Sequence, residues 1–200
     1  MIAFTLLAFL AIVGAVITIG EDMPSGSCIE ANSHALARYA ALCQECGLVP
    51  MVEPEVLMDG DHDIETCYEV TEVVLRSLFD ALYNQNVMLE GTILKASMVV
   101  PGKDCPTQAS VEEVAEATLM CLKSAVPAIM PGIVFLSGGQ SDEAATAHHH
   151  TPERDAPGAR AVLARLLDDA PDLGAPTRVE DVLAAEGWAR QHAGGVISGG

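Results

Sequence analysis

The chain has 200 residues, half of them hydrophobic, which is enough for one substantial core and predicts a single main domain. Its formal net charge of −18 argues against nucleic acid or an anionic membrane surface as a partner, because both repel an acidic protein. The six cysteines are scattered along the chain, which favours free thiols in a reducing compartment over a disulfide scaffold.

Residues 1–20 carry no charge and are almost entirely apolar. A stretch of this length fits a membrane span or a signal segment, but no Lys or Arg precedes Arg38 to set a topology or form the basic start of a signal peptide. A buried strand region within residues 4–19, or sequence joined on by a faulty gene model, is a third interpretation. The segment 1–20 is therefore expected to be a strand remnant, a signal or a membrane segment.

From about residue 27 onward, helix and strand patterns alternate. Helical spacing of apolar residues predicts helices at Ser27–Gly47, Ile64–Leu82 and Ser110–Leu122, and a further helix is expected to begin after the turn that ends at Ser141. Short apolar runs bounded by turn residues predict three strands, at Leu48–Glu53, Val87–Lys95 and Ile133–Leu136. Capping boxes are expected where the first and third helices begin, from Ser27 with Glu30 and from Ser110 with Glu113. This alternation is typical of a parallel sheet with crossover helices.

Glu53 and Glu55 end the first predicted strand two residues apart, so strand alternation points both carboxylates to the same face. Pro54, between them, is expected to prevent further pairing in the centre of a sheet. Two carboxylates in such a place can take different roles, because one can transfer protons while the other forms an ion pair with a charged neighbour. A polar strand end that turns into a loop explains the triplet nearly as well.

Lysine is scarce, with three in the chain, and only Lys95 lies at the end of an apolar strand. Partial burial disfavours the charged ammonium and supplies the neutral amine that attacks a carbonyl carbon. The alternative, which position alone favours, is a lysine that reaches from the strand end to solvent. Lys103, in a loop, and Lys123, on a helix, are expected to be solvated.

Ser137, Gly138 and Gly139 begin a glycine-rich turn after the last predicted strand. Small residues there let backbone N–H groups approach a phosphate at the start of a helix, although a tight connection also uses glycine. The acidic cluster Asp59–Asp63 is predicted to be a turn with a helix cap rather than a cation site. Catalytic groups at successive strand ends, followed by a phosphate loop, are what a β/α barrel active site requires.

Three stretches carry a resemblance to a known family: GLVPMVEPEVLMDGDHD at 47–63, LEGTILKASMVVPG at 89–102 and VPAIMPGIVFLSGGQSDEAATAH at 126–148. Together they resemble class I fructose-bisphosphate aldolase, over about residues 19–148. The resemblance implies a glycolytic lyase and an α/β fold, a partial TIM (β/α)8 barrel of parallel strands alternating with helices.

By this resemblance, Lys95 is the Schiff-base lysine, Glu53 the general acid/base and Glu55 the companion carboxylate. Ser137, Gly138 and Gly139 would bind a substrate phosphate. The implied reaction splits fructose 1,6-bisphosphate into dihydroxyacetone phosphate and glyceraldehyde 3-phosphate. The iminium acts as the electron sink, so no metal or other cofactor is implied.

The expected domains are the apolar segment 1–20, an aldolase barrel portion over 21–148, and an unrelated, partly disordered tail over 149–200. The resemblance also implies cationic side chains before Gly20, where Ile12, Gly14 and Thr18 stand instead. A partial barrel leaves strand edges uncovered, so poor solubility and little cleavage of the bisphosphate are expected. The alternative is a catalytically inactive aldolase remnant or a membrane-tethered binding module.

The expected partner is a small sugar phosphate, with no nucleic acid, and residues 1–20 are the one segment that suggests membrane contact. Enzymes of the family are usually homotetramers. The cytoplasm is the expected compartment, with a plastid or membrane-attached form as the alternative.

Overall fold

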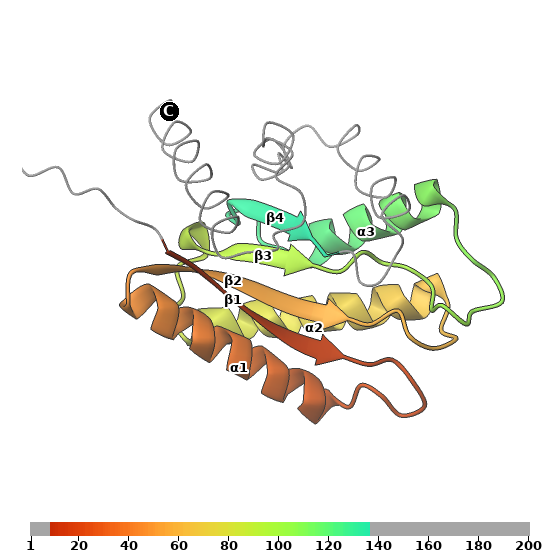
Figure 1. Ribbon diagram of the computed structural model, residues 1–200, viewed down its shortest axis with the longest axis horizontal. Helices are drawn as coiled ribbons and strands as arrows, with labels where there is room; N and C mark the ends of the chain where they lie inside the picture. The colour runs from red at the N-terminus through yellow and green to blue at the C-terminus, as the bar shows by residue number, and fades with distance from the viewer. Residues whose placement is uncertain (1–8, 137–200) are drawn as a thin grey trace, which may run out of the picture.

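The computed structural model describes residues 9–136, which form a parallel sheet and the helices that connect its strands (Figure 1). The elements follow one another as β1 (Phe9–Ile17), α1 (Gly26–Glu45), β2 (Leu48–Val56), α2 (Ile64–Asn84), the 3-10 turn η1 (Leu89–Gly91), β3 (Ile93–Ala96), α3 (Val111–Ala125) and β4 (Gly132–Phe135). The sheet order is β1-β2-β3-β4 and each neighbouring pair is parallel. The predicted alternation of strands and helices is therefore confirmed.

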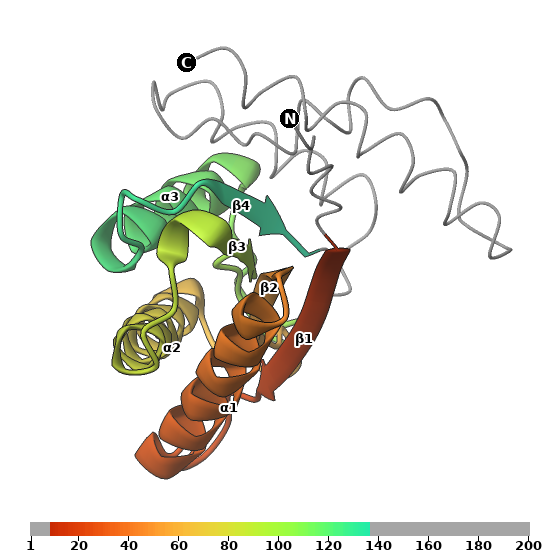
Figure 2. The same ribbon diagram turned by 90° about the vertical axis from the view of Figure 1, so that its left-hand side faces the viewer.

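All three helices lie on one face of the sheet (Figure 2). Their apolar sides and the strand residues that point toward them form one buried core, whose fully buried large side chains include Ile17, Leu36, Val52, Leu75, Leu78, Leu82 and Leu94. Burying each large aliphatic side chain contributes about 1.5–3 kcal/mol, so this layer is the main source of stability in the described part. Strand alternation then directs the intervening residues to the opposite, helix-free face.

The first helix begins earlier than the sequence predicts, because its cap is Ser25 and not Ser27. Ser25 has an extended backbone, and its hydroxyl accepts a hydrogen bond from the N–H of Cys28 at 3.2 Å. Ser27 already lies inside the first helical turn, so its side chain is not in the N-cap position, from which a hydroxyl accepts a hydrogen bond from the start of the helix. The capping box of the third helix is confirmed: Ser110 Oγ accepts from Glu113 N at 3.2 Å, and Glu113 Oε2 accepts from Ser110 N at 2.8 Å.

The strand that carries Lys95 is shorter than the prediction Val87–Lys95. At the start of the predicted strand, the side chain of Gln44 from α1 takes the place of hydrogen bonds to a neighbouring strand. Gln44 Oε1 accepts from Met88 N at 2.9 Å, and Gln44 Nε2 donates to Met88 O at 2.8 Å. Gln44 Nε2 also lies 3.2 Å from Thr92 Oγ1. Because these polar groups are satisfied by one glutamine, the chain makes the turn η1 before β3 begins.

As predicted for Pro54, β2 pairs with strands on both sides only as far as Val52, and beyond Val52 it pairs with β1 alone. Pro54 lies within β2, opposite Ala15 of β1, and β2 continues to Val56. Val56 N donates toward the β3 side, to Ser97 Oγ, so alternation puts the missing N–H of Pro54 on that side too. The ladder with β3 has already ended there, and the ladder with β1 loses nothing.

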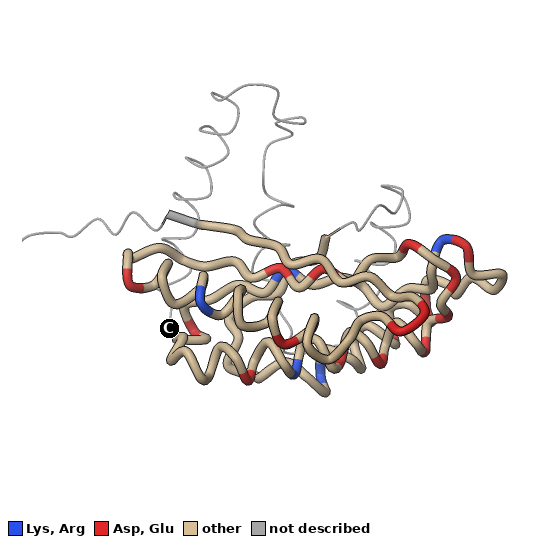
Figure 3. Tube along the Cα trace, turned by 90° about the horizontal axis from the view of Figure 1, so that it is seen from below, with Lys and Arg blue, Asp and Glu red and all other residues tan. Residues whose placement is uncertain are grey.

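Residues 9–17 of the apolar start form strand β1, which carries no charged side chain along its length (Figure 3). Ile12 and Val16 of this strand are half exposed, at 49% and 53%. Among residues 9–136, no helix has both the length and the hydropathy of a membrane span. All six cysteines, which this part of the chain contains, are free thiols.

Candidate active site

Lys95, Glu53 and Glu55 belong to the helix-free face of the sheet. Their strand neighbours Leu94 and Val56 are buried in the core beneath the helices, so alternation turns these three side chains the other way. Lys95 is one residue past the last β2–β3 pair, Val52 with Leu94, and Glu53 is one residue past it on β2. The register between β2 and β3 therefore brings the Lys95 amine and the Glu53 carboxylate side by side, although about 40 residues separate them in the sequence.

The Nζ of Lys95 lies 2.7 Å from Oε1 of Glu53. The two side chains are 27% and 14% exposed, so the ion pair is mostly shielded from solvent while one side remains open. A charge-assisted hydrogen bond of this length allows a proton to pass directly between the two groups. Lys95 therefore ends on a carboxylate, not in bulk water as the solvated alternative requires.

Glu55 lies on the same face and is partly buried, but it makes no ion pair with another residue of the range 9–136. The strand opposite contributes backbone and no charge: Gly14 is in register with Glu53, and Val16 with Glu55. A Cβ built on Gly14 would touch Glu53 Oε2 at 3.4 Å, so the β1 backbone forms a close wall beside that carboxylate. Lys95, Glu53 and Glu55 together can carry two negative charges and one positive charge.

Ser97 is a further polar residue at this end of the sheet. Its Oγ accepts a hydrogen bond from Val56 N at 2.9 Å, and the serine itself is 5% exposed. Nothing in the sequence singles it out, because a serine shortly after a strand is ordinary. Only the juxtaposition of the two strand ends gives it a partner.

The loops that follow β2 and β3 hold each other beside the candidate site. Lys103 N donates to Met58 O at 2.7 Å and Gly102 N donates to His62 O at 2.8 Å. A side chain on Gly102 would overlap the carbonyl oxygen of Gly60, so the close approach requires glycine there. The ammonium of Lys103 pairs with Asp59 at 3.1 Å on the surface, which agrees with the prediction of a solvated lysine.

The acidic cluster after β2 serves the turn and the helix that follows. Asp63 is the N-cap of α2, and its Oδ1 accepts from Thr66 N at 2.8 Å. This hydrogen bond lowers the pKa of the Asp63 carboxyl. Burial lowers the pKa of His62 despite the opposing attraction of Asp63 and Asp61. Among residues 9–136, no group of three or more His, Cys, Asp or Glu side chains is arranged to hold a metal ion.

Ser137, Gly138 and Gly139, and the helix expected after Ser141, lie outside the described residues. The last described residue, Leu136, donates its N–H to Ala96 O at 3.1 Å. β4 therefore ends beside the residue that follows Lys95.

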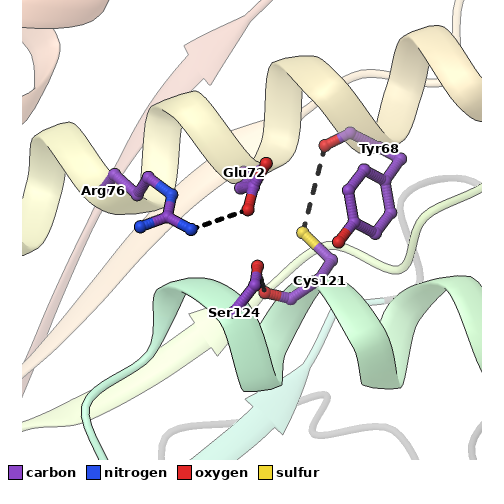
Figure 4. Close-up of polar contacts among 5 residues, drawn as sticks. All are labelled: Tyr68, Glu72, Arg76, Cys121 and Ser124. Atoms are coloured by element: carbon purple, nitrogen blue, oxygen red, sulfur yellow. Dashed lines mark hydrogen bonds and ion pairs between the residues drawn. The ribbon is translucent and has the colours of Figure 1, made fainter.

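A second polar cluster lies on the other side of the sheet, between α2 and α3 (Figure 4). Arg76 pairs with Glu72 at 2.8 Å, and the Cys121 thiol reaches the carbonyl of Tyr68 at 4.0 Å. Burial raises the pKa of Cys121 to about 12, so the thiol stays protonated and is a poor nucleophile. This cluster fastens two helices and is separate from the face that carries Lys95.

Comparison with known proteins gives consistent similarities. The family model described as "Fructose-bisphosphate aldolase class-I" matches residues 8–153. A probable fructose-bisphosphate aldolase class 1 from Xanthomonas campestris is 83% identical over 134 residues, 67% of this chain and 40% of that protein. A cytosolic fructose-bisphosphate aldolase 5 from Arabidopsis thaliana is 56% identical over 132 residues, 66% of this chain and 37% of that protein.

Similarity extends to a solved structure. Fructose-bisphosphate aldolase from Plasmodium falciparum, in a ternary complex with TRAP and a small-molecule inhibitor, superposes with a TM-score of 0.73 at 36% identity. The match covers 92% of this chain and 55% of that one. This chain thus spans about two-fifths of the length of the bacterial relative and about half of the solved structure. Its sheet is consistent with part of a TIM barrel.

Proposed function

Because this chain belongs to the class I fructose-bisphosphate aldolase family, we propose that Lys95 forms a Schiff base with a ketose phosphate. The observation that carries the proposal is the 2.7 Å contact between Lys95 Nζ and Glu53 Oε1 on the open face of the sheet. A nucleophilic amine needs a neighbouring group that removes its proton and returns it later. Glu53 has both the distance and the shielding from solvent for that task.

In the first step, Glu53 takes a proton from Lys95, and the neutral amine adds to the C2 carbonyl of fructose 1,6-bisphosphate. The resulting carbinolamine loses its hydroxyl as water when Glu53 returns a proton to that oxygen. The product is an iminium that joins Lys95 Nζ to C2. Glu55, on the same face and without an ion pair among residues 9–136, stabilises the positive charge of the iminium.

In the second step, the C4 hydroxyl gives its proton to the Glu53 carboxylate, which is free again after the dehydration, and the C3–C4 bond breaks. The electron pair of that bond moves toward the iminium and gives an enamine, while C4 leaves as the aldehyde of glyceraldehyde 3-phosphate. Protonation at C3 and hydrolysis of the iminium then release dihydroxyacetone phosphate and regenerate Lys95.

The remaining assignments are proposals on the same basis. Ser137, Gly138 and Gly139 bind a substrate phosphate, with backbone N–H groups as donors. The barrel portion is taken as residues 21–148 and the tail as residues 149–200. A cytoplasmic location is proposed because a similar plant protein is described as cytosolic.

The test is reductive trapping of the Schiff base. The 200-residue protein is incubated with dihydroxyacetone phosphate and sodium borohydride, and peptide mass spectrometry locates the adduct. A covalent adduct on Lys95 is expected, with loss of labelling in Lys95→Met and retention in Lys103→Met, because Lys103 pairs with Asp59 on the surface. An unlabelled Lys95 in folded protein would instead support the catalytically inactive alternative.

A further inference from the structure

The two strands of the candidate site lose their backbone pairing just where the site begins. The β2–β3 ladder ends at Val52 with Leu94. The next residue of β2 whose N–H would face β3 is Pro54, which has no N–H to donate. Glu53 and Lys95 therefore lie beyond the last ladder pair, at a point where parallel strands are free to separate.

A side chain closes this gap. Val56, the next residue that faces β3, donates its N–H to Ser97 Oγ at 2.9 Å. Both residues are 5% exposed, so water does not compete for the bond. Glu53 and Glu55 thus lie between two fastenings to β3, the ladder on one side and the Ser97 hydroxyl on the other.

We propose that Ser97 is a positioning residue that sets the distance between Lys95 and the two glutamates. This role rests on the proposed Schiff-base function of Lys95. Ser97 follows Lys95 by two residues, and Val56 follows Glu55 by one, so the hydrogen bond joins the two short segments that carry the reacting groups. The 2.7 Å proton-transfer contact depends on the separation of those segments, and an error near 1 Å reduces such a step by about a hundredfold.

The protein contains a matched control for this bond. Thr118 Oγ1 of α3 accepts a hydrogen bond from Val99 N at 2.9 Å, also in a buried setting. The donor, acceptor type and length are the same as at Ser97. This bond, however, ties the segment after β3 to a helix and not to β2. Thr118→Val therefore removes a similar hydrogen bond without loosening Glu53 from Lys95.

The experiment compares Ser97→Ala, Ser97→Thr and Thr118→Val with the unchanged protein. The rate of borohydride-trapped adduct formation on Lys95 is measured, with circular dichroism as the check of folding. Ser97→Ala is expected to slow trapping by about ten- to a hundredfold, whereas Ser97→Thr, which keeps the hydroxyl, recovers most of the rate. Thr118→Val is expected to stay within about threefold of the unchanged protein.

A second readout does not depend on Schiff-base chemistry. Competitive acetylation with a trace of acetic anhydride gives the labelling of Lys95 relative to surface Lys103 in the same molecule. Ser97→Ala is expected to raise this ratio at least about threefold, because a looser pair exposes the amine, and Thr118→Val to leave it unchanged.

The two readouts separate the two claims. If the unchanged protein forms no adduct, the Schiff-base proposal fails, while the acetylation ratio still decides whether Ser97 positions Lys95. The positioning role is overturned if Ser97→Ala leaves the acetylation ratio unchanged, or if Thr118→Val alters either readout as much as Ser97→Ala does.

Discussion

Replacing Glu53 by glutamine removes the proton acceptor 2.7 Å from Lys95 Nζ while keeping nearly the same size and an oxygen that accepts a hydrogen bond. The pair is 27% and 14% exposed, so solvent already weakens it, and the amide retains part of the contact. The expected loss in free energy of unfolding is therefore only about 1 kcal/mol, near the upper end for a solvent-exposed ion pair and below the value for a fully retained charged hydrogen bond. The fold should survive the substitution.

The chemical effect of Glu53→Gln is expected to be much larger than its effect on stability. An amide cannot take up the ammonium proton or return it to the carbinolamine oxygen, and loss of a general acid/base costs about 10²- to 10⁴-fold in rate. The assay is the rate of borohydride trapping on Lys95, beside urea unfolding of the same samples. Glu90→Gln is the control, because Glu90 is an exposed carboxylate in η1, before β3 begins.

A trapping rate of Glu53→Gln within about threefold of the unchanged protein would refute the reasoning, since general acid/base catalysis by Glu53 requires far more. A loss of several kcal/mol in stability would show that Glu53 is primarily a structural partner of Lys95.

Three other substitutions address the loops and the turn that frame the site. Gly102→Ala forces a Cβ onto the carbonyl of Gly60 and is expected to cost about 1–3 kcal/mol, measured by urea unfolding; a neutral result would mean that the two loops separate freely. Gln44→Ala removes both hydrogen bonds to Met88 and is expected to cost about 1–3 kcal/mol by the same measurement, with exposed Asn84→Ala near zero as its control. Burial lowers the pKa of the His62 imidazole from 6.5, so the unfolded chain binds a proton there more readily than the folded chain does. The folded state therefore keeps its full stability above pH 6.5 and loses part of it as the pH falls below that value. The melting temperature of His62→Asn should fall less between pH 7.5 and pH 5.5 than that of the unchanged protein, and equal falls would contradict the assignment.

Helices, caps and strands that depend only on nearby residues could be predicted from the sequence. The helix Ile64–Asn84, the capping box of Ser110 with Glu113 and the apolar strand before Ser137 follow from periodicity and from residues three apart. Lys95 stood out because lysine is rare here and its strand is apolar. Side-chain alternation also put Glu53 and Glu55 on one face before any pairing was known.

Features that depend on distant segments were not predictable. β3 is short because Gln44, 44 residues before Met88, satisfies the backbone at the start of that strand. Pro54 stays inside β2 because its missing N–H faces the side where the β3 ladder has ended. No local pattern contains either fact.

Composition and periodicity are local properties, so they were enough to show which residue types stand at the ends of the strands. The 2.7 Å contact between Lys95 and Glu53, and the hydrogen bond from Val56 to Ser97, arise only when the strands pair in the folded protein. The register between parallel strands fixes these contacts, and that register results from helices and core residues packing together across the whole sheet.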